Sequence, residues 1–192
     1  MKKLFFCLLV PILVACGNHD FDYSPKPKGY FRIDLPEHSY TQWDSLLPFT
    51  FDYSKAAVCK VEAKKEHVFW IDITYPAYNA VFNIACIPLK NNLRDLAVNE
   101  EKMVNFHIES GKADDVQLSY IEDPEAHVYG RIYDITGKEA ATTLQFWISD
   151  SVKYYVRGAL FFQFAPNNDS LQPVINYLKE DALQLVNSLK WK

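Results

Sequence analysis

One stretch near the carboxyl end constrains the fold most, because its apolar residues all fall on one helical face. Residues three or four apart share a face of an α-helix, so this spacing predicts a helix. Asp169 and Ser170 precede it as candidate caps, and Pro173 falls in the first predicted turn, where a missing N–H costs little. A helix that is apolar on one side must pack on another apolar surface. The stripe consists of Leu171, Val174, Ile175, Leu178, Ala182, Leu185, Val186 and Leu189.

Strands would supply that surface. Aromatic residues make up 15% of the chain, which favours a strand-rich fold because aromatic rings suit a half-buried pleated surface. Polar stretches at 136–139 and 149–151 have the character of hairpin connections, and Pro76 with Asn79 marks another turn. Such short connections cannot join parallel neighbours, so we expect an antiparallel meander in the second half. The predicted strands are 49–53, 58–63, 68–75, 80–87, 116–120, 127–135, 141–148 and 154–164.

A second helix is predicted between the two groups of strands. In the segment 92–110, apolar residues recur at helical spacing, from Leu93 and Leu96 to Val104 and Ile108, and Gly111 ends the pattern. The expected fold class is therefore α+β. An antiparallel meander sheet carries one helix after its first strands and a C-terminal amphipathic helix packed on it. Residues 30–192 are predicted to form a single globular domain.

The amino terminus has the organisation of an export signal. Lys2 and Lys3 precede an apolar run over 4–15, which is 12 residues long and shorter than the roughly 20 that span a bilayer. Residues 13–16 read Leu-Val-Ala-Cys and resemble a bacterial lipobox. The resemblance implies cleavage after residue 15 and attachment of lipid to Cys16. The alternative is an ordinary secretory signal with a chance cysteine near the cut.

The segment 16–29 is predicted to be a lipidated tether, since it is polar, contains Pro25 and Pro27 and has no apolar period. No acidic run follows Cys16 directly, which favours a periplasm-facing domain over one on the outer surface. The anchor gives the chain a membrane as its first partner.

Cleavage also changes the charge and the cysteine count. The formal charge of −4 becomes −6 when Lys2 and Lys3 are lost, which argues against a nucleic-acid partner. Cys59 and Cys86 are then the two cysteines that remain. An oxidising compartment permits a disulfide between them, but two buried thiols are the favoured interpretation.

Motifs for catalysis and metal binding are missing from the sequence. No pair of the 5 histidines has a metal-binding helical spacing, and no site for a metal or cofactor is predicted. His107 lies near the apolar stripe of the first helix, where a satisfied, partly buried histidine is the favoured interpretation and an acid or base the alternative. Asn167 and Asp169 are candidate oxygen ligands for a cation, but helix capping explains that stretch at less cost.

The sequence Ser149-Asp150-Ser151 places a hydroxyl beside a carboxylate, yet it lies between two strands and lacks the Gly-x-Ser-x-Gly elbow of common serine hydrolases. Turn capping is therefore the favoured role. Arg157 lies in a very apolar strand and needs a partner, for which Asp150 or Asp169 is the candidate unless the residue is exposed at an edge. Gly130 and Gly158 fall inside strand patterns and predict bulges or tight packing.

Several short motifs occur together in a characteristic order. They are residues 25–36 (Pro-Lys-Pro-Lys-Gly-Tyr-Phe-Arg-Ile-Asp-Leu-Pro), 128–130 (Val-Tyr-Gly), 145–146 (Gln-Phe) with 149–151, 157–162 (Arg-Gly-Ala-Leu-Phe-Phe), 166–170 and Trp191. With the lipobox, they resemble the gliding-motility lipoprotein D family (GldD) of Bacteroidetes over essentially the whole mature chain. The resemblance implies an envelope lipoprotein needed for gliding and supporting type IX secretion, with other proteins of that apparatus as partners. It brings no catalytic residues. The last two strands and final helix also look somewhat like the photosystem-associated P-protein fold, which says nothing about mechanism.

Two functional hypotheses follow. The first is a non-enzymatic, lipid-anchored interaction module of the cell envelope. Its candidate surface combines Arg157, Asp150, Asn167 and Asp169 with the segment 29–36, which includes Arg32 and Asp34.

The alternative is a periplasmic ligand-binding or hydrolytic lipoprotein with an aromatic-lined pocket. Trp70, Trp147 and Tyr155 are its candidate linings, although core packing is the more common use of such rings.

Overall fold

The computed structural model describes residues 29–30, 32–63, 67–164 and 167–192. Cys16, the signal segment 1–15 and the tether, apart from its last residue Gly29, lie outside the described residues. Two helices and ten strands in antiparallel pairs make up the described fold, which confirms the α+β prediction.

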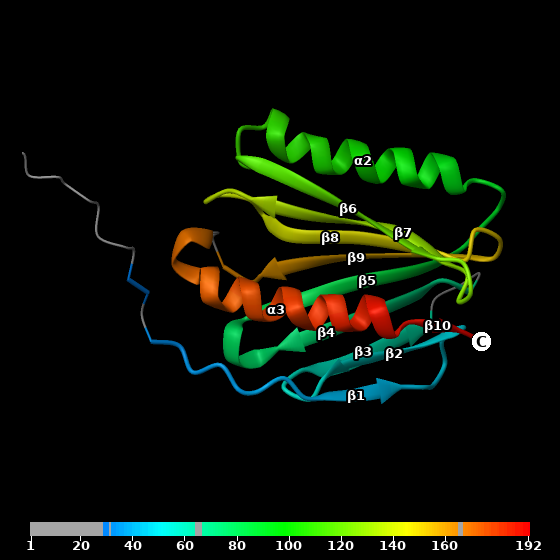
Figure 1. The fold of residues 1–192 in the computed structure, drawn as a ribbon, viewed down its shortest axis with the longest axis horizontal. Coiled ribbons are helices and arrows are strands. Elements are labelled where there is room, and N and C mark those ends of the chain that lie inside the picture. Colours follow the sequence, from blue (N-terminus) through cyan, green and yellow to red (C-terminus); the bar gives the residue numbers. More distant parts are fainter. Residues whose placement is uncertain (1–28, 31, 64–66, 165–166) are drawn as a thin grey trace, which may run out of the picture.

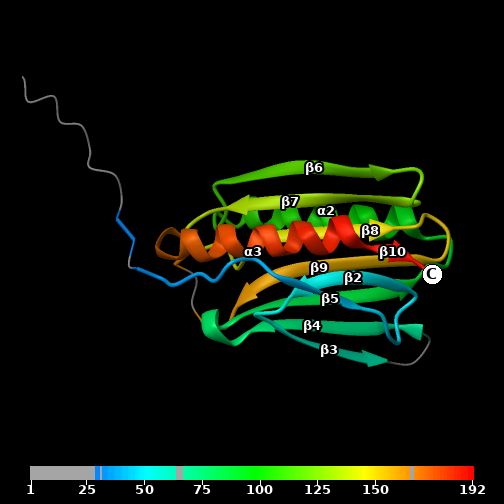
Figure 2. The same cartoon turned by 60° about the horizontal axis from the view of Figure 1, so that its bottom comes forward.

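The larger sheet contains seven strands in the order β3-β4-β5-β9-β8-β7-β6 (Figures 1 and 2). All eight predicted strands exist, and seven of them form this sheet. Strands β6 to β9 pair in succession, as the meander prediction required, and β9 returns to pair with β5. A turn of 3₁₀-helix, η3 (Pro76–Tyr78), joins β4 to β5 and ends at Asn79 with a φ of 48°. The strands are β3 (Val58–Ala63), β4 (Phe69–Tyr75), β5 (Ala80–Pro88), β6 (Asp115–Asp123), β7 (Val128–Thr136), β8 (Thr142–Ser149) and β9 (Tyr154–Phe162).

A small second sheet was not predicted. It consists of β1 (Tyr40–Trp43), β2 (Phe49–Ser54) and β10 (Lys190–Trp191), with β2 in the centre. Strand β1 is short and half polar, and β10 has only two residues, so neither carries a readable alternation. The predicted strand 49–53 is therefore real, but it belongs to a separate layer and not to the large sheet.

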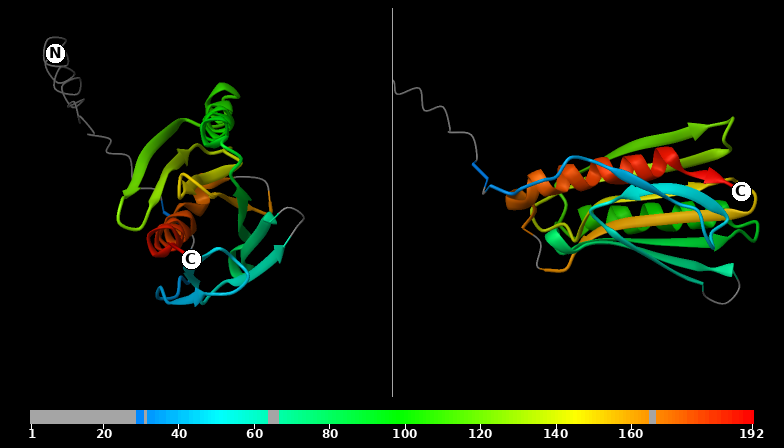
Figure 3. Two further views of the ribbon diagram at one scale, coloured as in Figure 1. Left: turned by 90° about the vertical axis from the view of Figure 1, so that its right-hand side faces the viewer. Right: turned by 90° about the horizontal axis from the view of Figure 1, so that it is seen from below.

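Helix α3 (Asn168–Ser188) lies between the large sheet and the small one (Figures 1 and 3). Its apolar stripe packs on both, and Phe49 and Phe51 of β2 close the core from the far side. The helix begins earlier than predicted. Asn167 is the N-cap residue, so Asp169 and Ser170 belong to the first turn and are not caps, and Pro173 falls in the second turn. The Asn167 side chain bonds the Ser170 hydroxyl at 3.1 Å.

Helix α2 (Leu93–Glu109) covers the opposite face of the large sheet, where a second core forms around Val104, Trp147 and Tyr155. Gly111, with a φ of 69°, follows its end as predicted. Among the larger contacts of α2 are those with β6 and β8. Strand β8 is buried along its whole length because α2 covers one of its faces and α3 the other. On the face that carries α2, the part of the sheet formed by β4 and β5 has no helix over it (Figure 3).

Two glycines and two cysteines behave as their strand positions predict. A Cβ at Gly130 would run into the carbonyl oxygen of Trp147, and one at Gly158 would lie 2.5 Å from the Phe146 ring. Both therefore mark tight packing. Cys59 and Cys86 are free thiols, which confirms that part of the favoured interpretation, but only Cys86 is fully buried and Cys59 is half-buried.

Candidate functional site

The candidate residues do not form one surface. Asp150 lies in the turn between β8 and β9, whereas Asn167 and Asp169 start α3 at the other end of β9. Arg157 lies in the middle of β9. The Arg32 guanidinium is 3.3 Å from the Asp34 carboxylate, and both side chains are more than nine-tenths exposed. The structure thus separates the predicted surface into regions at both ends and on one face of the domain.

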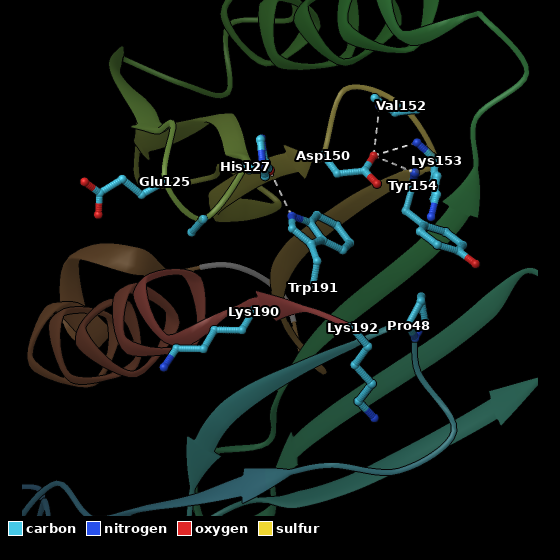
Figure 4. A pocket seen from close by; sticks show the side chains of 11 residues that line it. Pro48, Glu125, His127, Asp150, Val152, Lys153, Tyr154, Lys190, Trp191 and Lys192 are labelled. Atoms are coloured by element: carbon cyan, nitrogen blue, oxygen red, sulfur yellow. Dashed lines mark hydrogen bonds between the residues drawn. The ribbon is translucent and has the colours of Figure 1, made fainter.

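Asp150 caps its own turn. One carboxylate oxygen accepts backbone N–H bonds from Val152, Lys153 and Tyr154 at 3.0, 2.7 and 2.9 Å (Figure 4). The Ser149 hydroxyl donates to the Tyr154 carbonyl and accepts from the Ser151 N–H. These bonds confirm turn capping as the use of this motif, and Asp150 does not pair with Arg157.

Beside that turn, Pro48, the turn 125–127 and the C-terminal residues 190–192 border a pocket of about 730 Å³, which we call the Trp191 pocket. The Trp191 indole N–H donates to the carbonyl of His127 at 3.0 Å, and its ring stacks on Tyr154 with centroids 6.3 Å apart. The side chains of Lys190 and Lys192 extend away from the Trp191 ring (Figure 4). The pocket therefore has an aromatic wall, and both of these lysines and the acidic residue Glu125 contribute to its lining.

Arg157 pairs with a residue that sequence reasoning missed. Its Nε lies 3.0 Å from Glu100 Oε2, and Nη2 lies 3.4 Å from Oε1. The predicted partners, Asp150 and Asp169, were wrong because α2 places Glu100 directly over β9. The Glu100 side chain is only 1% exposed. Burial raises its pKa, and the Arg157 charge opposes that rise.

His107 is partly buried and bonded, as the favoured interpretation expected. Its Nε2 lies 3.1 Å from the side-chain nitrogen of Gln145, so this ring nitrogen accepts a bond from the amide. Burial lowers the pKa of His107, and Lys112 lowers it further. The imidazole is therefore favoured in its neutral form.

Arg157 and His107 come together along a groove between α2 and the open strands. Two hollows, of about 270 and 410 Å³, share Arg157, Ala159 and Phe161 as part of their lining. Ala85 pairs with Arg157 across β5 and β9, and Ala159 is the next residue on the same face. These small residues are almost completely buried and create the depressions. We call the two hollows together the Arg157 groove.

Large apolar side chains border the Arg157 groove. Trp70 of β4 is 48% exposed and lines the smaller hollow, whereas Phe106 of α2 is 62% exposed and lines the larger one with Met103. Trp147 and Tyr155 stack on each other beneath α2 with centroids 5.7 Å apart. Of the three predicted aromatic linings, only Trp70 therefore lines a described hollow.

A second cluster of ionisable groups fixes the segment before β1 onto α3. His38 Nδ1 lies 2.7 Å from Asp181, and its Nε2 lies 2.9 Å from Glu180. The Tyr75 hydroxyl also donates to Asp181 at 2.9 Å, and the Tyr177 ring stacks on the imidazole. Sequence reasoning gave these residues no role. Their arrangement ties the start of the globular fold to its C-terminal helix.

In the described parts of the chain, no three His, Cys, Asp or Glu side chains are arranged to hold a metal ion. The described helices include none with the length and apolarity to cross a bilayer.

Comparison with known proteins identifies the family of the chain and finds similar solved structures. A comparison with curated proteins finds no match. Among solved structures, the solution structure of cyanobacterial PsbP (CyanoP) from Synechocystis sp. PCC 6803 is similar at a TM-score of 0.46 and 10% identity, covering 84% of this chain and 98% of that one. Residues 20–191 match the family described as gliding motility lipoprotein GldD. The chain therefore belongs to the GldD family of gliding motility lipoproteins.

Proposed function

We propose that this protein is a lipid-anchored interaction component of the cell envelope that supports gliding motility and the associated type IX secretion machinery. The family supplies the gliding role and the lipoprotein character. The link to secretion comes from the same resemblance, and the non-enzymatic role is our inference. Cys16 would carry the lipid, and the domain would face the periplasm.

The observation that carries the proposal is the Arg157 groove. Exposed clusters of large apolar side chains on a soluble domain are typical of binding surfaces. Tryptophan and arginine are also the residues that most often dominate binding energy at protein interfaces. The groove opens on the face opposite α3 and the small sheet, whereas the segment leading from the tether is held on α3 by His38. A partner can therefore reach the groove while the protein stays anchored.

The length of the tether limits how far the Arg157 groove can lie from the membrane. At about 3.3–3.6 Å per extended residue, the 13 residues from 17 to 29 span up to about 45 Å. Anchoring would concentrate the domain near the membrane and so favour weak contacts with other membrane-bound proteins.

Phe106→Asp tests the proposal, because it places a charge in the groove at a position exposed enough to be tolerated by the fold. Tyr120→Asp is the matched control, since Tyr120 is an aromatic residue of β6 that is 70% exposed and lines neither hollow. We expect Phe106→Asp to abolish surface spreading and secretion of type IX cargo at normal protein levels, and Tyr120→Asp to retain both. Normal spreading and secretion with Phe106→Asp would refute the proposed role of the groove.

The Trp191 pocket favours the second candidate, a periplasmic ligand-binding lipoprotein. Its aromatic wall is suited to a flat or apolar ligand. A hydrolytic role is disfavoured because Asp150 serves to cap its own turn, where its Oδ1 accepts hydrogen bonds from three backbone N–H groups. Trp191→Ala separates the candidates once circular dichroism shows that the variant is folded, because Trp191 also packs on Phe49 and Tyr154. At normal protein levels, loss of function would favour the pocket as the working site, and normal function would favour the Arg157 groove.

A further inference from the structure

We propose that the Arg157 groove binds a short apolar segment of a partner protein that carries a carboxylate between two bulky side chains. This inference rests on the proposed function, since it names the chemistry of the partner at that same surface. Three features of the groove carry it: its local charge, an unsatisfied buried oxygen and its division into two hollows.

The charge of the groove differs from that of the chain. The whole sequence has a formal charge of −4, yet the described residues that line the two hollows include Arg157 and Lys102 and no carboxylate. Glu100 binds Arg157 through Nε and Nη2, and no bond from Nη1 to another described residue is found. The guanidinium can therefore donate hydrogen bonds from Nη1 to a second carboxylate. Lys102, which is exposed on α2, would add to the attraction.

The side-chain oxygen of Gln145 is a buried acceptor that lacks a hydrogen-bond donor in the described part of the chain. Gln145 is 4% exposed and lines the larger hollow. Its amide nitrogen is used by His107, whereas its side-chain oxygen has no partner among the described residues. A buried acceptor without a donor costs free energy, so a ligand N–H that reaches this oxygen when the Gln145 side chain turns toward the hollow gains affinity there. A peptide backbone supplies this donor, whereas an ionised fatty acid has none.

The two hollows define the spacing of the apolar groups. They lie on either side of Arg157, one bordered by Trp70 and the other by Phe106. Side chains that occupy both would place the segment between them over the guanidinium. A peptide with two apolar side chains and one carboxylate between them satisfies all three features. An ionised fatty acid offers a carboxylate to Arg157 but has no N–H donor and only one apolar chain.

The test uses the lipidated mature protein in phospholipid nanodiscs and follows the fluorescence of Trp70, which is half exposed in the groove. The probes are dodecapeptides with two leucines three or four residues apart and one glutamate between them. A second set has glutamine in place of glutamate. Trp70→Phe identifies the signal that comes from the groove.

We expect saturable binding of glutamate peptides and at least tenfold weaker binding of the glutamine set. Lys102→Gln should weaken the glutamate peptides severalfold, and Gln145→Leu should weaken both sets. Lys153→Gln, which removes a lysine from the Trp191 pocket, should change neither. Arg157→Ala is avoided because it would leave Glu100 buried without its partner. Circular dichroism checks that each variant is folded.

Equal affinity for the glutamate and glutamine sets would overturn the inference. So would the absence of peptide binding, or quenching of Trp70 by brominated phosphatidylcholine in the nanodisc, which would assign the groove to lipid. A crosslink between two copies through position 106 would assign it to self-association and would overturn it too. If no peptide binds while Phe106→Asp still abolishes gliding, the partner chemistry is wrong and the proposed function stands.

Discussion

Asp181 gives the sharpest test of how the domain is held together. Its side chain is 1% exposed on α3 and lies 2.7 Å from His38 Nδ1, and it accepts a 2.9 Å bond from the Tyr75 hydroxyl. Burial raises the pKa of Tyr75 above its usual value, and the Asp181 carboxylate raises it further. The phenol is therefore a donor throughout the accessible pH range. We expect Asp181→Ala to destabilise the domain strongly.

The loss of stability in Asp181→Ala depends on His38 and Tyr75, which lose their hydrogen-bond partner. A hydrogen bond to a charged group contributes about 1.5–3 kcal/mol, and Asp181→Ala removes two such bonds, which together contribute about 3–6 kcal/mol. The lower end applies here, because His38 is partly exposed and regains water and because Ser54 lies beside the Tyr75 hydroxyl. We therefore expect a loss of about 3 kcal/mol. For a urea m-value of about 2 kcal/mol/M, the unfolding midpoint would fall by about 1.5 M.

Glu180→Ala is the matched control. Glu180 is the neighbouring carboxylate on the same helix and lies 2.9 Å from the same histidine, but its side chain is 65% exposed. An exposed pair contributes less than about 1 kcal/mol, so its midpoint should fall by less than about 0.5 M. Urea unfolding of the purified mature protein, followed by circular dichroism, measures both. Equal shifts for the two variants would refute the argument that burial decides the value of this contact.

Three further predictions concern other parts of the domain. Burial lowers the pKa of His107 in the folded state, so its contribution to stability is present above the unfolded pKa near 6.5 and is lost as pH falls through the folded pKa. His107→Gln should therefore lose less stability than the parent protein between pH 7 and 5. Urea midpoints that fall in parallel for the two proteins would contradict this. Gly130→Ala should lower the free energy of unfolding by about 2–3 kcal/mol, because the new Cβ would clash with the Trp147 backbone. Gly29→Ala, where the Cβ meets open space, should leave the melting temperature unchanged. Equal melting temperatures for the two variants would exclude the close contact at Gly130. Burial raises the pKa of Cys59 and of Cys86 to about 12, so iodoacetamide at pH 8 should label them far more slowly in the folded protein than in urea, and rapid labelling of both in the folded protein would count against their burial.

Patterns that depend on neighbours in sequence were predictable. The stripe of α3 and the turn at Asp150 both arise from contacts within a few residues, which sequence spacing reveals. The small sheet was not predictable in the same way, because β10 has two residues and pairs with a strand near the other end of the chain. Its stability comes from packing on α3 and not from an alternation of its own.

The important ionic contacts escaped prediction for a related reason. Glu100 falls in register with Leu93, Leu96 and Val104 on the buried face of α2, and Asp181 does the same on α3. A carboxylate within an apolar stripe was a readable signal of a buried pair. Its partner was not readable, because Arg157 and His38 lie 57 and 143 residues away along the chain.

The most direct test of the central claim is photocrosslinking in living cells from position 106, in the Arg157 groove, and from position 120 on β6 as the control. We expect a discrete adduct from position 106 with a protein of the gliding or type IX secretion apparatus, and none from position 120. An adduct pattern that is the same at both positions, or specific to position 120, would contradict it.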